Sequence, residues 1–190
     1  DFTGAPVGAH PTVTLLSGNL LEIVEHNTTY DFRLDPNEDY SGQTFHVTGD
    51  GRGGTLIFID PSVQSVTTSG LDITNGVGDL NAGHTVTFTL NMNEDVFVDT
   101  TAGAPTLSLN DGAKATYVGG SGTNSLTFKT TVASTDMNTS ALAITGVNLP
   151  SGASIKDAGG LAADLSGAAK TFTGLQIDPQ TTPTTPSVTR

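Results

Sequence analysis

The most regular stretch of the chain alternates apolar and polar side chains from His84 to Met92. Its apolar positions are Val86, Phe88, Leu90 and Met92, and threonines or an asparagine stand between them. Because successive side chains of a strand point to opposite faces of its sheet, this run predicts a β-strand with one buried face. His84, at the start of the strand, is expected to be exposed.

Shorter strand-like runs follow and are separated by turn signals such as Asn110-Asp111-Gly112 and Pro150-Ser151-Gly152. They cover residues 96–98, 106–109, 115–118, 126–128, 142–144 and 171–177. About seven short strands with turns every 8–12 residues are typical of a β-sandwich. No stretch has sustained helical periodicity, although residues 161–170 are expected to hold one short helical turn.

The first 58 residues carry a separate set of strand-like runs, at 13–16, 20–24, 29–34, 44–47 and 55–58. A unit of this size buries only a thin core, so we expect it to need a neighbouring unit in order to fold well. Residues 59–61 (Ile-Asp-Pro) recur as residues 177–179 and bracket the longer region. We therefore predict an all-β chain with a small β-rich unit over 1–58, a linker at 59–61, a sandwich over 62–178 and a Thr/Pro-rich linker over 179–190.

Charge narrows the possible partners of the chain. Seven Lys and Arg stand against nineteen Asp and Glu, a formal net charge of −12. Nucleic acid and anionic membrane surfaces repel such a chain, whereas carboxylate and carbonyl oxygens suit Ca²⁺. The alternative explanation is that the acidity only keeps an exported protein soluble. No apolar run approaches the ~20 residues of a membrane helix, so no membrane insertion is expected.

Several chemistries have no support in the sequence. Cysteine is absent, which excludes a disulfide scaffold and a thiol nucleophile. Residues 119–123 fail the Gly-x-Ser-x-Gly pattern at its last position, and no His-Glu-x-x-His occurs. We therefore predict no enzyme. The chain starts abruptly at Asp1 without a signal peptide, so we expect it to be part of a longer exported protein.

Several short motifs follow one another in a recognisable order and spacing. They lie at residues 78–83 (Gly-Asp-Leu-Asn-Ala-Gly), 105–112 (Pro-Thr-Leu-Ser-Leu-Asn-Asp-Gly) and 155–159 (Ile-Lys-Asp-Ala-Gly). In this respect residues ~62–178 resemble the bacterial immunoglobulin-like repeats of giant exported adhesins and other cell-surface proteins. Residues 40–55 resemble a short β-rich repeat of proteins exported by the type I route. The resemblance implies an immunoglobulin-like β-sandwich, arrayed in tandem outside the cell or on its surface.

Some members of this family hold Ca²⁺ between neighbouring modules, and the resemblance implies such joints here. Asp60 and Asp178, in the two Ile-Asp-Pro segments, stand where joint ligands would stand, and Asp79 and Asp157 match acidic loop positions of the repeat. The family pattern Asp-x-Ala-Gly-Asn is broken after Asp157, because Gly160 replaces the asparagine. The alternative is that these Asp-Pro and Asp-Gly pairs only form turns.

A second, weaker Ca²⁺ candidate comprises Asp35, Asn37 and Asp39. Oxygen ligands at alternate positions resemble the start of an EF-hand loop. The sixth position of that loop is Tyr40 instead of glycine, and the twelfth is His46 instead of glutamate, so no EF-hand is predicted. The alternative is an acidic, solvated turn.

These observations favour a non-catalytic stalk module of a large secreted or surface-anchored bacterial adhesin-like protein, in contact with neighbouring repeats of its parent chain. One alternative is an accessory module that binds extracellular polysaccharide or a host receptor. Sugar stacking normally uses exposed aromatics, but the chain has no Trp and only three Tyr, of which Tyr117 is expected to pack in the core. Another alternative is a self-associating component of a surface layer or biofilm matrix.

Overall fold

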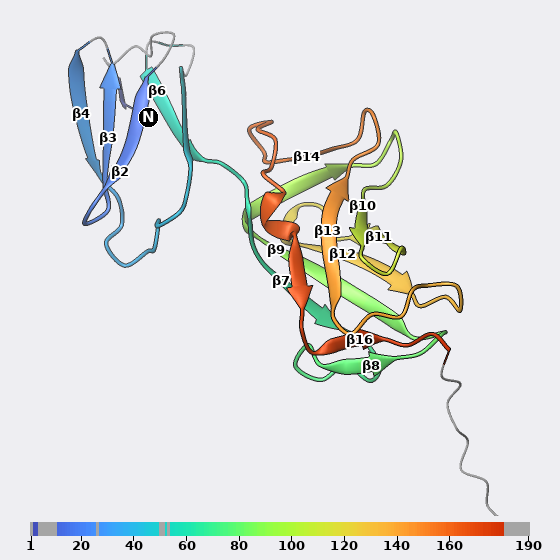
Figure 1. Cartoon of the computed structure of the whole chain (residues 1–190). Helices are drawn as coiled ribbons and strands as arrows, with labels where there is room; N and C mark the ends of the chain where they lie inside the picture. Colours follow the sequence, from blue (N-terminus) through green and yellow to red (C-terminus); the bar gives the residue numbers. More distant parts are fainter. Residues whose placement is uncertain (1, 4–10, 26, 50–51, 53, 181–190) are drawn as a thin grey trace, which may run out of the picture. The chain divides into compact units, whose positions relative to one another are not determined.

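The computed structural model describes residues 2–3, 11–25, 27–49, 52 and 54–180, and this part of the chain is almost entirely β-structure (Figure 1). Its one helical element is a 3₁₀ turn, η1 (Ser166–Ala168), which confirms the short helical turn expected within 161–170. No helix in the described ranges has the length and hydropathy to cross a bilayer. The chain divides into two compact units between Asp60 and Pro61, inside the predicted linker.

The first unit contains two small antiparallel sheets. One is the meander β2 (Thr12–Leu16), β3 (Leu20–Glu25) and β4 (Thr28–Arg33). The other has the order β1 (Phe2–Thr3), β6 (Gly54–Ile59) and β5 (Phe45–Gly49). Each of the five predicted strands is therefore confirmed to within about two residues. Among the described side chains of this unit, the buried apolar ones are Leu21, Ile23 and Val47, so its core is thin.

The second unit is an antiparallel sandwich that closes almost completely on itself (Figure 1). Its main strands, in spatial order, are β7 (Val63–Ser69), β9 (Thr85–Asp99), β12 (Thr123–Thr131), β11 (Lys114–Gly119), β10 (Thr106–Leu109), β13 (Leu142–Asn148) and β15 (Lys170–Phe172). β14 (Ser154–Lys156) pairs with the far half of β9. A separate parallel pair joins β8 (Gly78–Leu80) to β16 (Leu175–Ile177).

The core confirms the alternation seen in the sequence. Val86, Phe88 and Leu90 are fully buried and Met92 nearly so. Phe88 packs against Phe172 with ring centroids 5.8 Å apart. Burying one such side chain contributes about 1.5–3 kcal/mol, so this face of β9 is a main source of stability.

Three of the predicted strand-like runs merge or divide in the structure. The runs 84–92 and 96–98 belong to one continuous strand, β9, which begins at Thr85. Asn93 keeps the segment extended, because its N–H donates to the Ser62 carbonyl at 3.0 Å and its side-chain oxygen accepts the Ser62 N–H at 2.7 Å. Conversely, the predicted run 171–177 breaks into β15 and β16. The chain leaves β13 there and turns towards β8, where the Gly78 N–H donates to the Gly174 carbonyl at 3.0 Å.

The second unit begins and ends at opposite poles. Near its start, Ser62 bonds to Asn93 and Val63 pairs with Met92, at the middle of β9. Near its end, the Asp178 N–H donates to the Leu80 carbonyl, and Gln180 Nε2 donates to the Ser134 carbonyl. Both of these contacts lie beside the start of β9, since Thr85 pairs with Thr131. We call the Ser62 end the proximal pole and the Gln180 end the distal pole.

Candidate functional site

Two of the four predicted joint ligands, Asp79 and Asp178, lie at the distal pole. Asp79 is in β8 and Asp178 directly follows β16, where the Asp178 N–H continues the pairing with Leu80 at 3.0 Å. Both carboxylates alternate with the buried Leu80 and Ile177, so they lie on the same outer face of the parallel pair. Asp178 Oδ1 also accepts the Gln180 N–H at 3.4 Å.

Asp157 lies near the proximal pole, in the turn after β14. Its side chain is only 7% exposed, and its Oδ1 accepts the Leu161 N–H at 2.7 Å. The backbone of Asp157 bonds to Leu161 and Gly160 as well, so this aspartate closes a tight turn. The following residues reach the first strand through the bridge between Ser62 and Asp164. The segment in which the sequence departs from the family pattern is therefore a tight turn closed by Asp157.

Asp60 belongs to the first unit, where its N–H donates to the Thr44 carbonyl at 2.7 Å. Within the sandwich, the structure places Asp157 apart from Asp79 and Asp178. Within the described residues, no group of three or more His, Cys, Asp or Glu side chains is placed to hold a metal ion. In the sandwich, two of the predicted ligands lie at the distal pole and one lies near the proximal pole.

The weaker Ca²⁺ candidate is a pair of side-chain-capped turns. Asp35 Oδ1 accepts the Asn37 backbone N–H at 2.9 Å and the Asn37 side-chain amide at 3.0 Å. Asp39 Oδ1 accepts the Ser41 hydroxyl at 2.6 Å and the Ser41 N–H at 2.9 Å, and these bonds lower the pKa of Asp39. Asn19 Nδ2 binds two carbonyls of the same loop at 2.8 Å each. These contacts have the pattern of a solvated turn.

A buried acidic residue that the sequence did not single out lies in the β10–β11 turn. Asp111 is 2% exposed and accepts the Ala113 N–H at 3.0 Å. Burial raises the pKa of Asp111, and the nearby Asp136 carboxylate raises it further. The sequence identified Asn110-Asp111-Gly112 as a turn and as the end of the 105–112 motif, without a role for the Asp111 carboxylate. Its tertiary role is to bind the crossover before β13, since the Met137 N–H donates to the Asp111 carbonyl at 2.9 Å.

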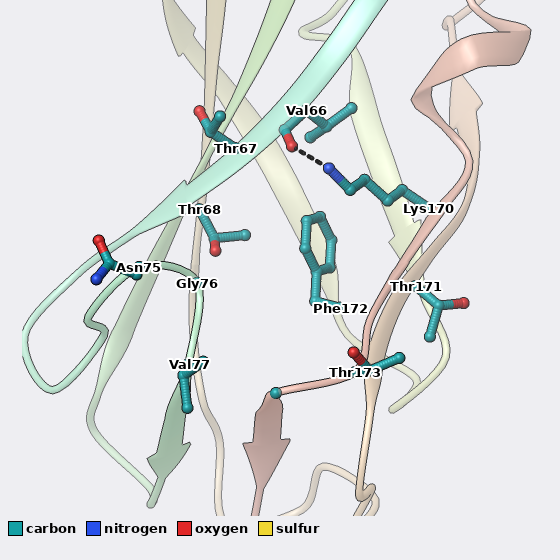
Figure 2. A pocket seen from close by; sticks show the side chains of 11 residues that line it. Val66, Thr67, Thr68, Asn75, Gly76, Val77, Lys170, Thr171, Phe172 and Thr173 are labelled. Atoms are coloured by element: carbon teal, nitrogen blue, oxygen red, sulfur yellow. Dashed lines mark hydrogen bonds between the residues drawn. The ribbon is translucent and has the colours of Figure 1, made fainter.

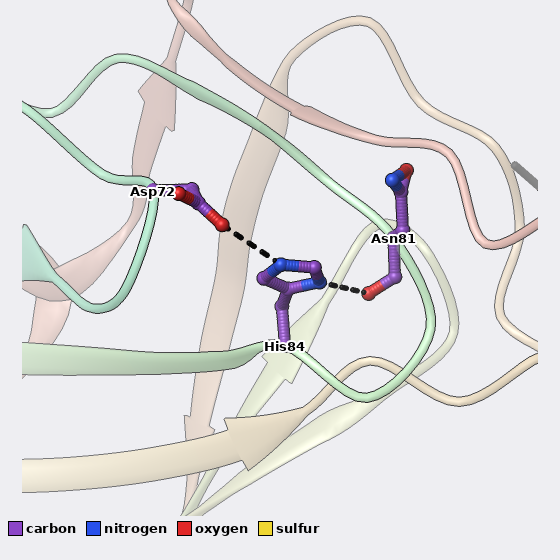
Figure 3. A network of polar contacts seen from close by, with 3 residues as sticks. All are labelled: Asp72, Asn81 and His84. Carbon is purple, nitrogen blue, oxygen red and sulfur yellow. Dashed lines mark hydrogen bonds and ion pairs between the residues drawn. The ribbon is translucent and has the colours of Figure 1, made fainter. Parts of the chain in front are cut away.

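His84 is part of a polar network, and the expectation that it is exposed is wrong (Figure 3). Its side chain is 17% exposed and lies between two acceptors. Nε2 lies 2.9 Å from Asp72 Oδ2, and Nδ1 lies 3.0 Å from the Asn81 carbonyl. The loop 70–77 folds back to bring Asp72 here, and Asp72 itself has a left-handed backbone with φ of +64°. His84 therefore ties this loop to the start of β9.

The open edges of the sandwich form a groove between β7 and β15 (Figure 2). It has a volume of about 440 Å³ and is lined by Val66 and Thr68 from β7, by Lys170 and Phe172 from β15, and by the loop at Asn75–Val77. Lys170 Nζ crosses the groove to donate to the Val66 carbonyl at 2.7 Å, and it lies 5.5 Å from the centre of the Phe172 ring. No motif in the sequence pointed to this feature.

Aromatic side chains give little support to sugar stacking. Tyr117 packs edge-on against Phe128, with ring centroids 5.6 Å apart, as expected for a core residue. Tyr30 and Tyr40 are both half-buried, and Tyr40 packs against Phe45 at 6.1 Å. Phe97, which is 50% exposed on β9, is the most open aromatic of the described residues.

Comparisons of the chain with protein-family models, with curated proteins and with solved structures find no match. The geometry of this molecule therefore carries the functional argument.

Proposed function

We propose that the chain is a non-catalytic structural module of a large secreted or surface-anchored bacterial protein, a stalk or spacer of the adhesin type. The observation that carries this proposal is the position of the two poles. The backbone begins the sandwich beside Met92, halfway along the long strand β9, and leaves it beside Leu80, which precedes the start of that strand. Modules with this geometry extend a chain when they are linked in series.

The first and last strands of the sandwich also suit a mechanical role. A pull on the two ends draws β7 along β9 and β16 along β8. Both pairs are then loaded in shear, because their hydrogen bonds run across the strands and share the force. The β7–β9 ladder pairs residues from Val63 to Ser69, and the β8–β16 pairing extends to Asp178.

The distribution of carboxylates supports Ca²⁺ at the joints of such a series. Asp79 and Asp178 lie on one face at the distal pole, and Asp157 lies near the proximal pole. In a tandem array, the distal pole of one module faces the proximal end of the next, so that two partial sets are brought together. Ca²⁺ takes six to eight oxygen ligands, more than either pole offers alone.

The stalk proposal is tested by pulling the whole chain from its two ends in an optical trap. The matched variants are Gln176→Pro and Gln176→Ala. The Gln176 backbone faces β8, since the Ile177 backbone bonds to Thr139 on the other side. Proline therefore removes a bond of the β8–β16 pair, whereas alanine keeps it.

We expect the wild type and Gln176→Ala to unfold at the same high force, and Gln176→Pro to unfold at a clearly lower one. A mechanical role would be contradicted if the wild-type sandwich extended without a resolved unfolding step, as an unstructured chain does. Circular dichroism of each variant checks that the sheet is intact before pulling.

A further inference from the structure

The sandwich is left open between β7 and β15 by the direction of its strands. Every neighbouring pair from β7 through β9, β12, β11, β10 and β13 to β15 is antiparallel. The number of these steps is even, so β7 and β15 run in the same direction. A single strand of opposite direction, placed between them, would be antiparallel to both.

Backbone groups on both sides point into this gap. The Val66 carbonyl faces it, because it accepts the bond from Lys170 Nζ. Since backbone groups alternate sides along a strand, those of Thr68 face the gap as well. On β13, the Ala143 backbone bonds to Asn110 and so points away from β15. The β13 residues on either side of Ala143 therefore face β15 and pair with Lys170 and Phe172. The backbone of Thr171 is therefore also directed into the gap.

The reach of Lys170 is compatible with a gap one strand wide. Adjacent strands lie about 4.8 Å apart, so two strands with one missing between them lie about 10 Å apart. An extended lysine side chain and its 2.7 Å hydrogen bond to the Val66 carbonyl cover most of that distance, and Figure 2 shows Lys170 reaching across in this way.

Both ends of the gap are closed by backbone contacts. At the proximal end a Cβ on Gly167 would lie 2.5 Å from the Val63 carbonyl oxygen, so the two chains touch there. At the distal end the Gly78 N–H bonds to the Gly174 carbonyl at 3.0 Å. The open length between these contacts is therefore a few residues of each strand.

Two polar groups inside the gap indicate what would fill it. Thr68 Oγ1 is buried and has no hydrogen-bond partner. Of the described residues that line the groove, Lys170 carries the only charge, and its ammonium group is held by a neutral carbonyl. A carboxylate would pair with that ammonium group better than the carbonyl does.

We propose that the gap between β7 and β15 binds an extended, acidic peptide strand of another protein by strand addition. The incoming strand runs antiparallel to both edges and bonds to the backbones of Val66, Thr68 and Thr171. A carboxylate of the incoming strand pairs with the Lys170 ammonium group, which then no longer donates to the Val66 carbonyl. That carbonyl can instead accept a backbone N–H of the incoming strand. This role is independent of the stalk function, and either can fail without the other.

The probe is the capped peptide acetyl-Thr-Val-Thr-Glu-Thr-Val-Thr-amide, added to the ¹⁵N-labelled full chain and followed by amide hydrogen exchange. We expect binding to slow exchange at the Thr68 and Thr171 amides by about tenfold or more, because both become hydrogen-bonded. The Thr67 amide, which faces β9, is the internal reference. A control peptide with lysine in place of glutamate should bind at least tenfold more weakly.

Matched variants separate strand addition from surface adsorption. Thr68→Pro and Thr171→Pro each remove an N–H that faces the gap and leave the neighbouring ladder bonds in place. Both should abolish peptide binding while their spectra remain dispersed, and Ser69→Ala, an exposed position of β7 outside the groove lining, should bind as the wild type does. Lys170→Met keeps the apolar stem and should lose the preference for glutamate over lysine.

Three results would overturn the proposal. The first is unchanged exchange at Thr68 and Thr171 with millimolar peptide. The second is equal binding of the two peptides to the wild type, or wild-type affinity in folded Thr68→Pro or in Lys170→Met. The third is sedimentation equilibrium that shows dimers whose formation protects the same amides without peptide, since the occupant would then be a second copy of this chain.

Discussion

Asp111 is a carboxylate that the fold buries in a turn, and its environment works against its charge. Burial raises its pKa, the Asp136 carboxylate raises it further, and the Ala113 N–H only partly offsets these effects. Because its pKa is higher in the folded state than in the unfolded chain, the ionised form destabilises the fold. This penalty is present at neutral pH and disappears as the pH falls through the raised pKa towards the unfolded value of about 3.9.

We therefore predict that Asp111→Asn stabilises the protein at pH 7 by about 1 kcal/mol. Asparagine keeps an oxygen that accepts the Ala113 N–H but carries no charge. Denaturant unfolding at pH 7 and pH 4 measures the effect, which should shrink at the lower pH. Loss of stability in Asp111→Asn at pH 7 would contradict the conclusion that the ionised Asp111 destabilises the fold.

Asp99 is the matched control for this substitution, with the opposite sign. It is exposed, and hydrogen bonds from the Thr101 backbone and hydroxyl lower its pKa. Its contribution is present above the unfolded pKa and is lost as the pH falls through the folded value. Asp99→Asn should therefore not stabilise the protein at pH 7.

Two adjacent glycines should respond very differently to alanine. Gly120 has φ of +106°, and a Cβ there would lie 2.0 Å from the Ser125 carbonyl oxygen. We expect Gly120→Ala to destabilise the sandwich by more than about 2 kcal/mol. Gly119 has no atom within 4 Å of an added Cβ, so Gly119→Ala should change stability by less than about 0.5 kcal/mol. Thermal unfolding of both variants measures the two changes in stability. Equal effects would contradict the close approach of Gly120 to the Ser125 carbonyl.

At the scale of elements, the loop 70–77 is tied to the start of β9 by the side chain of His84, which directly precedes that strand. His84 binds Asp72 at 2.9 Å and the Asn81 carbonyl at 3.0 Å. The same loop forms one wall of the β7–β15 groove through Asn75 and Val77. The network at His84 therefore fixes part of the groove as well as the start of β9.

We predict that His84→Ala loosens this loop and lowers the free energy of unfolding by about 1 kcal/mol. Amides within 71–77 should exchange faster, whereas those of β12 should not change. His46→Ala, an exposed position on β5, is the control. If the loop amides of His84→Ala exchanged at the wild-type rate, the backbone alone would hold the loop.

Strands were predicted well where one face alternates and poorly where pairing alone defines them. β7 contains only two apolar residues, Val63 and Val66, so its pattern is weak. It forms because its backbone completes the edge of β9 from Val63 to Ser69. β8 and β14 are three residues each and likewise owe their extended form to a partner strand. Such elements carry too little hydrophobic periodicity to be seen in a single sequence.

For the whole molecule, the proposed calcium joints predict that removal of Ca²⁺ changes the maximum dimension of the chain before it unfolds the sandwich. Removal of Ca²⁺ should loosen the connection between the two units without unfolding the sandwich. Small-angle scattering of the full chain with millimolar CaCl₂ and with excess chelator measures the maximum dimension. An unchanged dimension would count against calcium at this joint.

Thermal unfolding under the same conditions gives a second measure. A site that binds only the folded state adds about 2.7 kcal/mol at a hundredfold excess over Kd. Because the ligands lie at separate poles, we expect a larger increase in Tm for two linked copies of the chain than for one. Asp79→Asn and Asp178→Asn should remove that difference. Equal increases for one copy and two would place any calcium within a module.

The sequence by itself determined the all-β class, the strands with a buried face, and the acidic character of the protein. These properties follow from local rules, since alternation, turn residues and charge act over a few positions. It also placed the division of the chain near Asp60. The resemblance to adhesin repeats, with its calcium ligands, remains a prediction.

Only the tertiary structure decided where those residues meet. It placed Asp79 and Asp178 at one pole and Asp157 near the other, buried Asp111, and drew His84 into a network. It also set β7 and β15 in the same direction and left a gap between them. The reason is that each of these relations joins segments far apart in the chain, and the pairing order of the strands, which no local pattern encodes, fixes them all at once.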